Sequence, residues 1–257
     1  MQAKAWSRVT GLVATLVSLS VFAWPLFISQ ESQTAMAQGV FIGLMPLLVI
    51  IVLAEYGSGS LGSRQLAVLG LLIALNASIR LLGAGVAGVE TAFFLIIIAG
   101  YVFGAGFGFT MGAGSLLVSA LLGAGVGPWL PFQMMAAGLV GVGAGALGSL
   151  TRRLQSRAVL EVALLCAYAI PASFGYGALL TLWNWPFLAG EGSTLSFVAG
   201  ASPLANLTTF IRYEFFTGGL LWDLGRTLTT AILLALTAKT LLATLRRAAN
   251  KAGIRRS

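Results

Sequence analysis

The sequence contains no histidine, one cysteine and few charged residues, and each shortage excludes a class of function. Without histidine, neither a Ser-His-Asp triad nor a Cys/His zinc site can form within this chain. The single cysteine, Cys166, lies in an apolar run, so a disulfide framework is excluded and a packing role is expected. The sequence also lacks a G-x-x-x-x-G-K-[ST] phosphate loop, so it has no P-loop site for ATP.

Apolar residues dominate what is present. Charged residues make up 9% of the 257 residues and hydrophobic residues 58%, with a mean hydropathy of +0.95. Soluble domains carry about 25% charge. Several apolar runs reach about 18 residues, the length that a helix needs to cross a bilayer. The runs are continuous rather than alternating, so we expect an all-α integral membrane protein instead of a barrel.

Eight apolar segments predict membrane helices. The first continues to Phe27 without a clear cleavage site, so we expect a retained helix rather than a signal peptide. The fourth is short, and we expect it to form a nearly continuous, kinked unit with the fifth. The segments lie at about 9–29, 37–54, 65–82, 91–103, 105–122, 132–150, 159–182 and 219–244.

The cations predict the orientation of the chain. With the N-terminus in the cytoplasm, only Arg80, Arg212 and Arg226 of the fifteen Lys and Arg residues fall at or near the outer side, which leaves twelve inside. This split follows the positive-inside rule and places both termini in the cytoplasm. We therefore expect the basic residues to meet anionic lipid and not nucleic acid.

Small residues recur at helical spacing in three segments. Gly104, Gly108 and Gly112 share one face, as do Gly141 and Gly145. Such faces predict close helix packing in lipid. A third face, Gly70, Ala74 and Ser78, suits either internal packing or a sliding contact with another membrane subunit.

The stretch GAGVGPWLPFQ at 123–133 predicts a rigid outer turn. Pro128 and Pro131 restrict the backbone, whereas the glycines permit conformations closed to other residues. A tryptophan held in this way, Trp129, could stack on a flat ring, and Gln133 offers a hydrogen-bond donor and acceptor beside it. The alternative is a structural turn that fixes the two flanking helices.

Charged and aromatic side chains near the outer side supply further candidate binding residues. Arg80 lies near the outer end of its helix, and Asp223 and Arg226 share a face of the last helix, either as a structural pair or as ligand contacts. A long segment from Trp183 to about Gly218 is predicted as a loop that contains a short interfacial helix at about 203–216, started by Ser202-Pro203. This helix either covers the site or docks on the membrane. The remaining candidates are Glu90, Trp183, Asn184, Trp185 and Tyr213, with Glu191, Arg212 and Glu214 less distinctive.

Residues about 64–245 resemble the substrate-binding S component of energy-coupling factor (ECF) vitamin transporters. The resemblance rests on AVLGLLIALNASIR, IIIAGYVFGAGFG, TMGAGSLLVSALL and above all GVGPWLPFQ, followed by a basic inner loop and two more helices. It implies a six-helix binding core at 61–245, preceded by an extra pair of membrane helices within 1–60 and followed by a basic tail at 246–257. The extra pair departs from the family.

The resemblance implies a division of labour in a bacterial cytoplasmic membrane. This chain would bind a vitamin or related micronutrient at the outer face, with no cofactor and no catalysis of its own. A transmembrane T component and two cytoplasmic ATPases would power transport by rotating the chain in the membrane, with Gly70, Ala74 and Ser78 contacting the T component. Many tryptophans favour a cobalamin-like corrinoid, whereas flavin, thiamin-like and other vitamins stay open.

The sequence leaves two other functions open. A self-contained, gradient-coupled permease for a small heterocyclic solute would need broken helices, inverted repeats and midplane carboxylates, which the sequence does not display clearly. An intramembrane enzyme would need a nucleophile with an activating base. Ser115 and Ser119 lie four residues apart but lack such a partner in the sequence.

Overall fold

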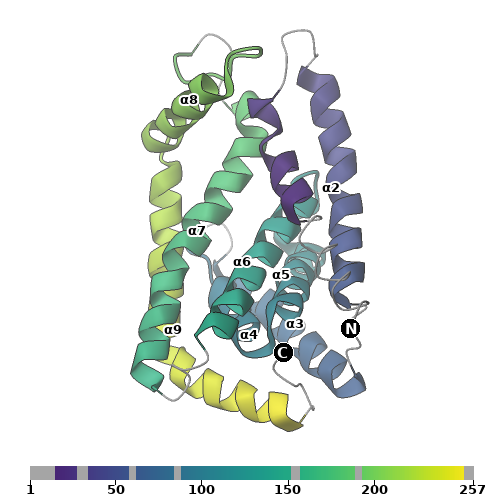
Figure 1. Cartoon of the computed structure of the whole chain (residues 1–257), viewed down its shortest axis with the longest axis vertical. Coiled ribbons are helices and arrows are strands. Elements are labelled where there is room, and N and C mark those ends of the chain that lie inside the picture. Colours follow the sequence, from purple (N-terminus) through teal and green to yellow (C-terminus); the bar gives the residue numbers. More distant parts are fainter. Residues whose placement is uncertain are drawn as a thin grey trace.

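The computed structural model of the chain describes residues 15–27, 34–57, 62–83, 88–151, 157–188 and 193–251. Within these ranges every regular element is helical (Figure 1). Residues 15–22 are helical and lead into η1 (Trp24–Leu26). The following elements are α2 (Thr34–Gly57), α3 (Ser63–Gly83), α4 (Phe93–Phe103), α5 (Ala105–Ser119), η2 (Ala120–Ala124), α6 (Leu130–Leu150), α7 (Ala158–Leu188), α8 (Pro203–Phe216) and α9 (Gly219–Lys251).

The lengths of these helices fit a protein that crosses a membrane several times. Among the described residues, five helical segments are long and apolar enough to span a bilayer: α3, α5 together with η2, α6, α7 and α9. Two further apolar segments are shorter, Ile42–Ala54 within α2 and Phe93–Phe103. The predicted all-helical, multi-pass class is therefore confirmed, whereas the division into two plus six helices stays a prediction.

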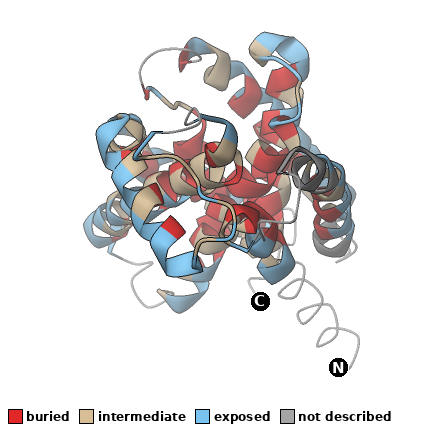
Figure 2. Ribbon diagram, turned by 90° about the horizontal axis from the view of Figure 1, so that it is seen from above, coloured by how far each residue is buried: buried red, intermediate tan, exposed pale blue. Residues whose placement is uncertain are grey.

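Glycine faces hold the centre of the bundle together. A Cβ atom built on Gly108 would collide with the backbone at Gly141, one on Gly112 with the backbone at Ala137, and one on Gly145 with that of Ala105. The backbones of α5 and α6 therefore touch, as the spacing of the small residues predicted. Figure 2 shows the buried residues gathered in the middle of the bundle, with exposed residues on the outer faces of the peripheral helices.

The junction of α4 and α5 differs from the prediction. Gly104 has a φ of +99°, a conformation that disfavours any residue with a side chain. A Cβ atom on Gly108 would lie 2.8 Å from the Cα atom of Gly100, although eight residues of continuous helix span about 12 Å. The expected nearly continuous unit is therefore wrong: the chain bends sharply at Gly104, and α4 and α5 both pack on Gly141.

The C-terminal end of α7 and the short helix α8 lie at one end of the bundle. The predicted seventh segment stopped at 182, whereas α7 continues to Leu188, so Trp183, Asn184 and Trp185 are helical rather than part of a loop. The prediction was wrong because Pro186 and the polar Asn184 look like helix breakers in sequence. The short helix predicted at about 203–216 is confirmed as α8, and the Ser202 hydroxyl accepts from the Ala205 amide at 3.2 Å.

The described N-terminal segment packs on the bundle through aromatic side chains. The Phe22 ring meets the Phe132 ring edge to face, with centroids 5.5 Å apart. The Trp24 indole donates to the Trp183 carbonyl at 2.8 Å. In Figure 1 this purple helix leans against α7, with α2 beside it, so the segment is joined to α6 and α7 by buried contacts.

The end of the bundle opposite to α8 carries several basic residues, and we call it the basic end. The Arg64 guanidinium donates to the Lys251 carbonyl at 3.4 Å, which brings the start of α3 to the end of α9. Arg246 forms a salt bridge with Glu161 at the start of α7, and the Tyr101 hydroxyl donates to the same carboxylate at 3.2 Å. Glu191, one of the less distinctive candidates, lies outside the described ranges.

Candidate functional site

A pocket of about 340 Å³ lies where α7, α8 and α9 meet, and we call it the α8-end pocket. Its lining comes from all three helices and mixes aromatic, hydroxyl and charged side chains with two glycines. Among the lining residues are Gly177, Thr181, Tyr213, Gly219, Trp222, Asp223 and Arg226. Three of these, Tyr213, Asp223 and Arg226, were predicted as binding residues from the sequence.

An ion pair forms the charged part of the pocket lining. Asp223 and Arg226 are one helical turn apart on α9 and form a salt bridge, as their spacing predicted. Asp223 is 3% exposed, and its carboxylate lies directly against Gly177 of α7. A side chain at Gly177 would displace that carboxylate, so the glycine is what allows the pair to sit at the α7–α9 contact.

The Arg226 guanidinium is held from several sides. Its Nη1 atom donates to the Ser173 carbonyl at 3.2 Å as well as to Asp223. Its Cζ atom lies 5.0 Å from the centroid of the Tyr176 ring and 5.8 Å from that of Phe93, both within range of a cation–π contact. The positive charge of the pair is therefore already engaged by α4 and α7.

A second carboxylate, Glu214, lies behind the pocket wall and is not one of the lining residues. It is 6% exposed, and neither of its carboxylate oxygens has a hydrogen-bond partner. Its Oε2 atom lies against Gly219, which lines the pocket. Burial raises the pKa of Glu214, and the positive charge of Arg226 offsets part of that rise.

Helix α8 forms one wall of the pocket and faces two environments. Asn206, Phe210 and Glu214 recur every four residues and are buried, so this face meets the bundle. The opposite side exposes large apolar residues: Leu204, Leu207, Ile211 and Phe215. An apolar outer face suits lipid, so α8 can dock on a membrane while its inner face covers the pocket.

Predicted tryptophans on α7 support α8 instead of lining the pocket. Trp185 is fully buried, donates to the Leu195 carbonyl at 3.1 Å and packs 5.5 Å from the Phe210 ring. Its ring centroid lies 6.4 Å from that of Tyr213. Trp183 stacks on Phe132 at 3.9 Å, on the side of the N-terminal segment. Asn184, between the two tryptophans, is half-buried and does not line the pocket.

The Pro-Trp turn has the shape that its sequence predicted, but it lies apart from this pocket. Gly123 and Gly125 have φ values of +128° and +95°, which requires glycine or a strained residue. The Trp129 ring folds back over Gly127 and stays 46% exposed. Gln133 is half-buried in the first turn of α6, and neither it nor Trp129 lines the α8-end pocket.

Arg80 and Glu90 have local partners. The Arg80 guanidinium donates to the Ser119 hydroxyl at 3.0 Å and so connects α3 with α5. The Glu90 carboxylate accepts from the Ala92 amide at 3.1 Å, immediately before α4. Both residues therefore make structural contacts within the helix bundle. Neither of them lines the α8-end pocket.

The small-residue face of α3 is exposed in the part of the chain that the structure describes. Gly70, Ala74 and Ser78 are all exposed, and a Cβ atom on Gly70 would meet no atom within 4 Å. The Ser78 hydroxyl donates to the Ala74 carbonyl at 2.9 Å, so this polar group is satisfied within the helix. Of the two interpretations offered by the sequence, the exposure of this face among the described residues favours a contact with another subunit.

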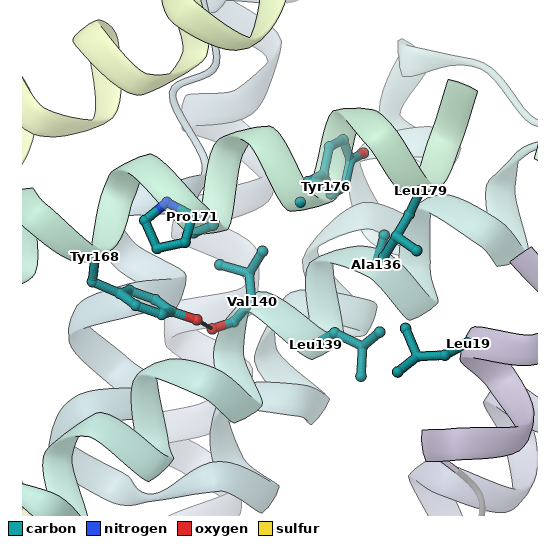
Figure 3. A pocket seen from close by; sticks show the side chains of 10 residues that line it. Leu19, Ala136, Leu139, Val140, Tyr168, Pro171, Tyr176 and Leu179 are labelled. Carbon is teal, nitrogen blue, oxygen red and sulfur yellow. Dashed lines mark hydrogen bonds between the residues drawn. The ribbon is translucent and has the colours of Figure 1, made fainter. Parts of the chain in front are cut away.

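A second cavity differs from the α8-end pocket in chemistry. It has a volume of about 260 Å³ and lies between α6 and α7, with Leu19 of the N-terminal helix facing it (Figure 3). Ala136, Leu139, Val140 and Leu179 make its lining apolar. Its Tyr168 hydroxyl already donates to the Val140 carbonyl at 2.8 Å. This cavity offers no charged group, so the α8-end pocket is the better candidate site.

The sequence reasoning undervalued Glu214 and missed Gly177, Gly219 and Thr181. Glu214 was considered only as a less distinctive candidate. Its four-residue spacing from Phe210 and Asn206 could have indicated that it shares the buried face of α8. Nothing in the sequence indicates which glycine of α7 receives the Asp223 carboxylate, because that depends on the crossing of α7 and α9.

No protein-family model, curated protein or solved structure matches this chain.

Proposed function

We propose that this chain is the substrate-binding membrane subunit of an ECF-type importer, which captures a vitamin-like micronutrient at the outer face. The observation that carries the proposal is the α8-end pocket, which combines a buried ion pair with aromatic and hydroxyl side chains beside the short helix α8. Buried charges in a membrane protein favour a binding or transport site over a structural one. The pocket also lies at the end of α9 remote from the basic Arg246 and Lys251.

The size of the pocket favours a small nutrient. Small-molecule sites occupy about 300–1,000 Å³, and 340 Å³ lies at the lower end of this range. The corrinoid suggestion rested on the number of tryptophans, but Trp183 and Trp185 are engaged in internal packing. A single heterocycle with polar substituents fits this volume better than a corrinoid macrocycle.

The power for transport would come from partner subunits. The sequence has no P-loop, and the exposed face of Gly70, Ala74 and Ser78 offers a smooth contact for a transmembrane T component. Two cytoplasmic ATPases would then act through that component. The gathering of cations at one end of the bundle is consistent with that end facing the cytoplasm.

Co-purification tests this proposal. The full chain, tagged and expressed at its native level, is expected to bring down a membrane partner, ATPase subunits and a bound micronutrient, identified by mass spectrometry. Gly70→Trp should reduce recovery of the partners by about tenfold or more, because a large side chain prevents close helix approach. Leu236→Trp, at a position on α9 that is 75% exposed, is the matched control. Purification of the chain without ATPases under these conditions would contradict the proposal.

A second candidate function, a proton-coupled permease, is favoured by Glu214. A buried carboxylate without a hydrogen-bond partner is the kind of group that can take up and release a proton during transport. The discriminating experiment uses the purified chain alone in proteoliposomes with an imposed pH gradient. Solute accumulation without any ATPase would support the permease and exclude the importer subunit.

A further inference from the structure

The lining of the α8-end pocket carries no net charge, and this limits the solutes that the pocket can accept, an inference that rests on the proposed function. Asp223 and Arg226 are the charged residues of the lining, and they form a salt bridge with each other. Helix α7 contributes only uncharged residues to the lining, and α8 with its C-terminal cap contributes Tyr213 and Thr217. Glu214 lies behind the wall, and burial raises its pKa, which favours its uncharged form.

An ion that enters such a lining loses its hydration without gaining an opposite charge. Removing a charged group from water costs several kcal/mol unless a partner of opposite charge replaces the water. Asp223 and Arg226 can serve an added ion only by giving up their own salt bridge. An uncharged polar solute avoids most of this cost, because hydrogen bonds alone can replace those that it made with water. The charge balance therefore favours uncharged polar solutes over cations and anions.

Arg226 is the member of the pair that can still donate to a solute. Among the described residues, both of its hydrogen bonds start from Nη1, one to Asp223 and one to the Ser173 carbonyl. Its Nη2 group therefore keeps its hydrogens, and its buried Nε atom has no partner. The Arg226 side chain is 13% exposed and that of Asp223 4%, so the donor is the more accessible of the two. A carbonyl oxygen is an uncharged group that accepts this kind of charge-assisted hydrogen bond.

Hydroxyl and aromatic side chains supply the rest of the site. Thr181, Tyr213 and Thr217 line the pocket, and each hydroxyl oxygen can accept from an N–H group. The Thr217 hydroxyl already donates to the Tyr213 carbonyl at 2.7 Å, which leaves its oxygen as an acceptor. Trp222 and the Tyr213 ring add flat apolar surfaces to the same lining. A ring that carries a carbonyl next to an N–H group matches this set of partners.

We propose that the α8-end pocket selects uncharged solutes whose ring carries an amide-type group, a carbonyl acceptor beside an N–H donor, over cations and anions of the same shape. Arg226 donates to the carbonyl oxygen, and a lining hydroxyl accepts from the N–H group. The inference thus names the charge and the recognition group of the nutrient, which the importer proposal leaves open.

Three probes of nearly equal shape test this preference. The purified full chain in lipid nanodiscs is titrated with benzamide, benzamidine and benzoate, which are uncharged, cationic and anionic at neutral pH, and binding is measured by calorimetry. Benzamide is expected to bind the most tightly, by about tenfold or more, because each ion loses its hydration in a lining that holds no unpaired opposite charge.

Adding a charge to the lining should redirect the preference. Thr217 is exposed just after α8, so Thr217→Lys and Thr217→Glu add a positive or a negative charge while the Asp223–Arg226 pair stays intact. Relative to benzamide, benzoate should gain about threefold in Thr217→Lys and benzamidine about threefold in Thr217→Glu, as for an exposed ion pair. Thr208 is the matched control, because it is also exposed, makes the same hydroxyl-to-carbonyl hydrogen bond and does not line the pocket. Thr208→Lys and Thr208→Glu should leave the ratios unchanged.

A double variant separates the role of Arg226 from that of net charge. Asp223→Asn combined with Arg226→Gln keeps the lining uncharged and leaves neither partner alone as a buried charge. Benzamide should bind about tenfold more weakly, because a hydrogen bond from a charged donor to its carbonyl is lost. It should still bind more tightly than benzamidine and benzoate. Thermal unfolding checks that this variant folds, and if it does not, the Thr217 variants, which keep the pair, decide the inference.

Four results would overturn the inference: benzamidine or benzoate binding as tightly as benzamide, Thr217 variants with unchanged ratios, full benzamide affinity in the folded double variant, or no binding of any probe. The importer proposal is judged separately by co-purification. Recovery of a charged micronutrient with ATPases would discard the selection of uncharged solutes and keep the importer. Selection of benzamide by a chain that never associates with ATPases would do the reverse.

Discussion

Two buried carboxylates each lie against a glycine that lines the candidate site, Asp223 on Gly177 and Glu214 on Gly219. At the scale of single residues, the position of each buried carboxylate therefore depends on the space left by a glycine. A carboxylate reaches the interior only where the facing backbone carries no side chain. These two glycines are needed because a side chain at either position would overlap a carboxylate. Their own backbone conformation does not require glycine.

Substitution of Gly177 tests this link between space and charge. Gly177→Ala places a methyl group where the Asp223 carboxylate lies, so the carboxylate must shift and its salt bridge with Arg226 is expected to weaken. Loss of a buried charged hydrogen bond costs about 1–3 kcal/mol, and thermal unfolding in detergent should reveal a lower melting temperature. Gly175→Ala, two residues earlier on α7 with no atom within 4 Å of the new Cβ, should change little. Equal melting temperatures for the two variants would contradict this account.

Glu214 is expected to destabilise the empty protein. Burial raises its pKa in the folded state above the ordinary value of 4.5, so the folded protein holds this proton more tightly than the unfolded chain. Stability from this group is then greatest at low pH and falls as pH rises from about 4.5 through the raised pKa. Glu214→Gln should raise stability at neutral pH by about 1 kcal/mol, roughly 2–4 °C, and have little effect at low pH. The measurement is a series of melting curves across pH, with Glu90→Gln as the control. A Glu214→Gln variant that is less stable than the wild type at neutral pH would refute this prediction.

At the scale of elements, the contact between α5 and α6 depends on backbone approach. Gly141 on α6 faces both Gly108 on α5 and Gly100 on α4, so one position serves two helices. In lipid the hydrophobic effect contributes little between helices, and close packing carries the association. The centre of the bundle should therefore tolerate side-chain volume poorly at this point.

Gly141→Ala is expected to destabilise the protein by about 1–3 kcal/mol, because its methyl group would overlap the backbone at Gly108. Gly70→Ala adds the same methyl group on an exposed face of α3 and should be neutral in the isolated chain. The measurement is the melting temperature of the two variants in the same detergent. If Gly70→Ala proved the more damaging, the assigned roles of the two glycine faces would be wrong.

The sequence predicted the helices better than the connections between them. Apolar length identified the membrane segments, and Ser202-Pro203 marked the start of α8 correctly, because both signals are local. A kink between the segments at 91–103 and 105–122 was expected, but the sharpness of the bend at Gly104 was not, since a glycine within a helix and one at a sharp bend look alike in sequence. The extension of α7 through Trp185 depends on tertiary packing against Phe210 and Tyr213.

The candidate site was predictable only in part, for the same reason. Asp223 and Arg226 are one turn apart, so their pairing follows from helix geometry alone. Trp129 was expected at the site because the turn is rigid, but rigidity does not say where a turn lies relative to a pocket. Glu214 is buried next to the site through the orientation of α8, which depends on contacts with α7 and α9.

At the scale of the whole molecule, charge differs between the two ends. Arg64, Arg246 and Lys251 come together at the basic end, where Arg246 pairs with Glu161. The α8 end holds the pocket and the apolar outer face of α8. A membrane potential and anionic inner lipids both favour the cytoplasm for the basic end. If so, the pocket and the Pro-Trp turn belong to the outer side.

Cysteine labelling tests this orientation in intact cells. In a Cys166→Ser background, Val126→Cys places a thiol in the Pro-Trp turn, where Val126 is 64% exposed, and Val159→Cys places one at the start of α7, where Val159 is 82% exposed. A membrane-impermeant maleimide should label Val126→Cys from outside and reach Val159→Cys only after permeabilisation. The opposite pattern would put the pocket on the cytoplasmic side, where an importer subunit could not use it to capture a nutrient. Because both positions lie on one chain, the comparison needs no external standard: each variant is the control for the other.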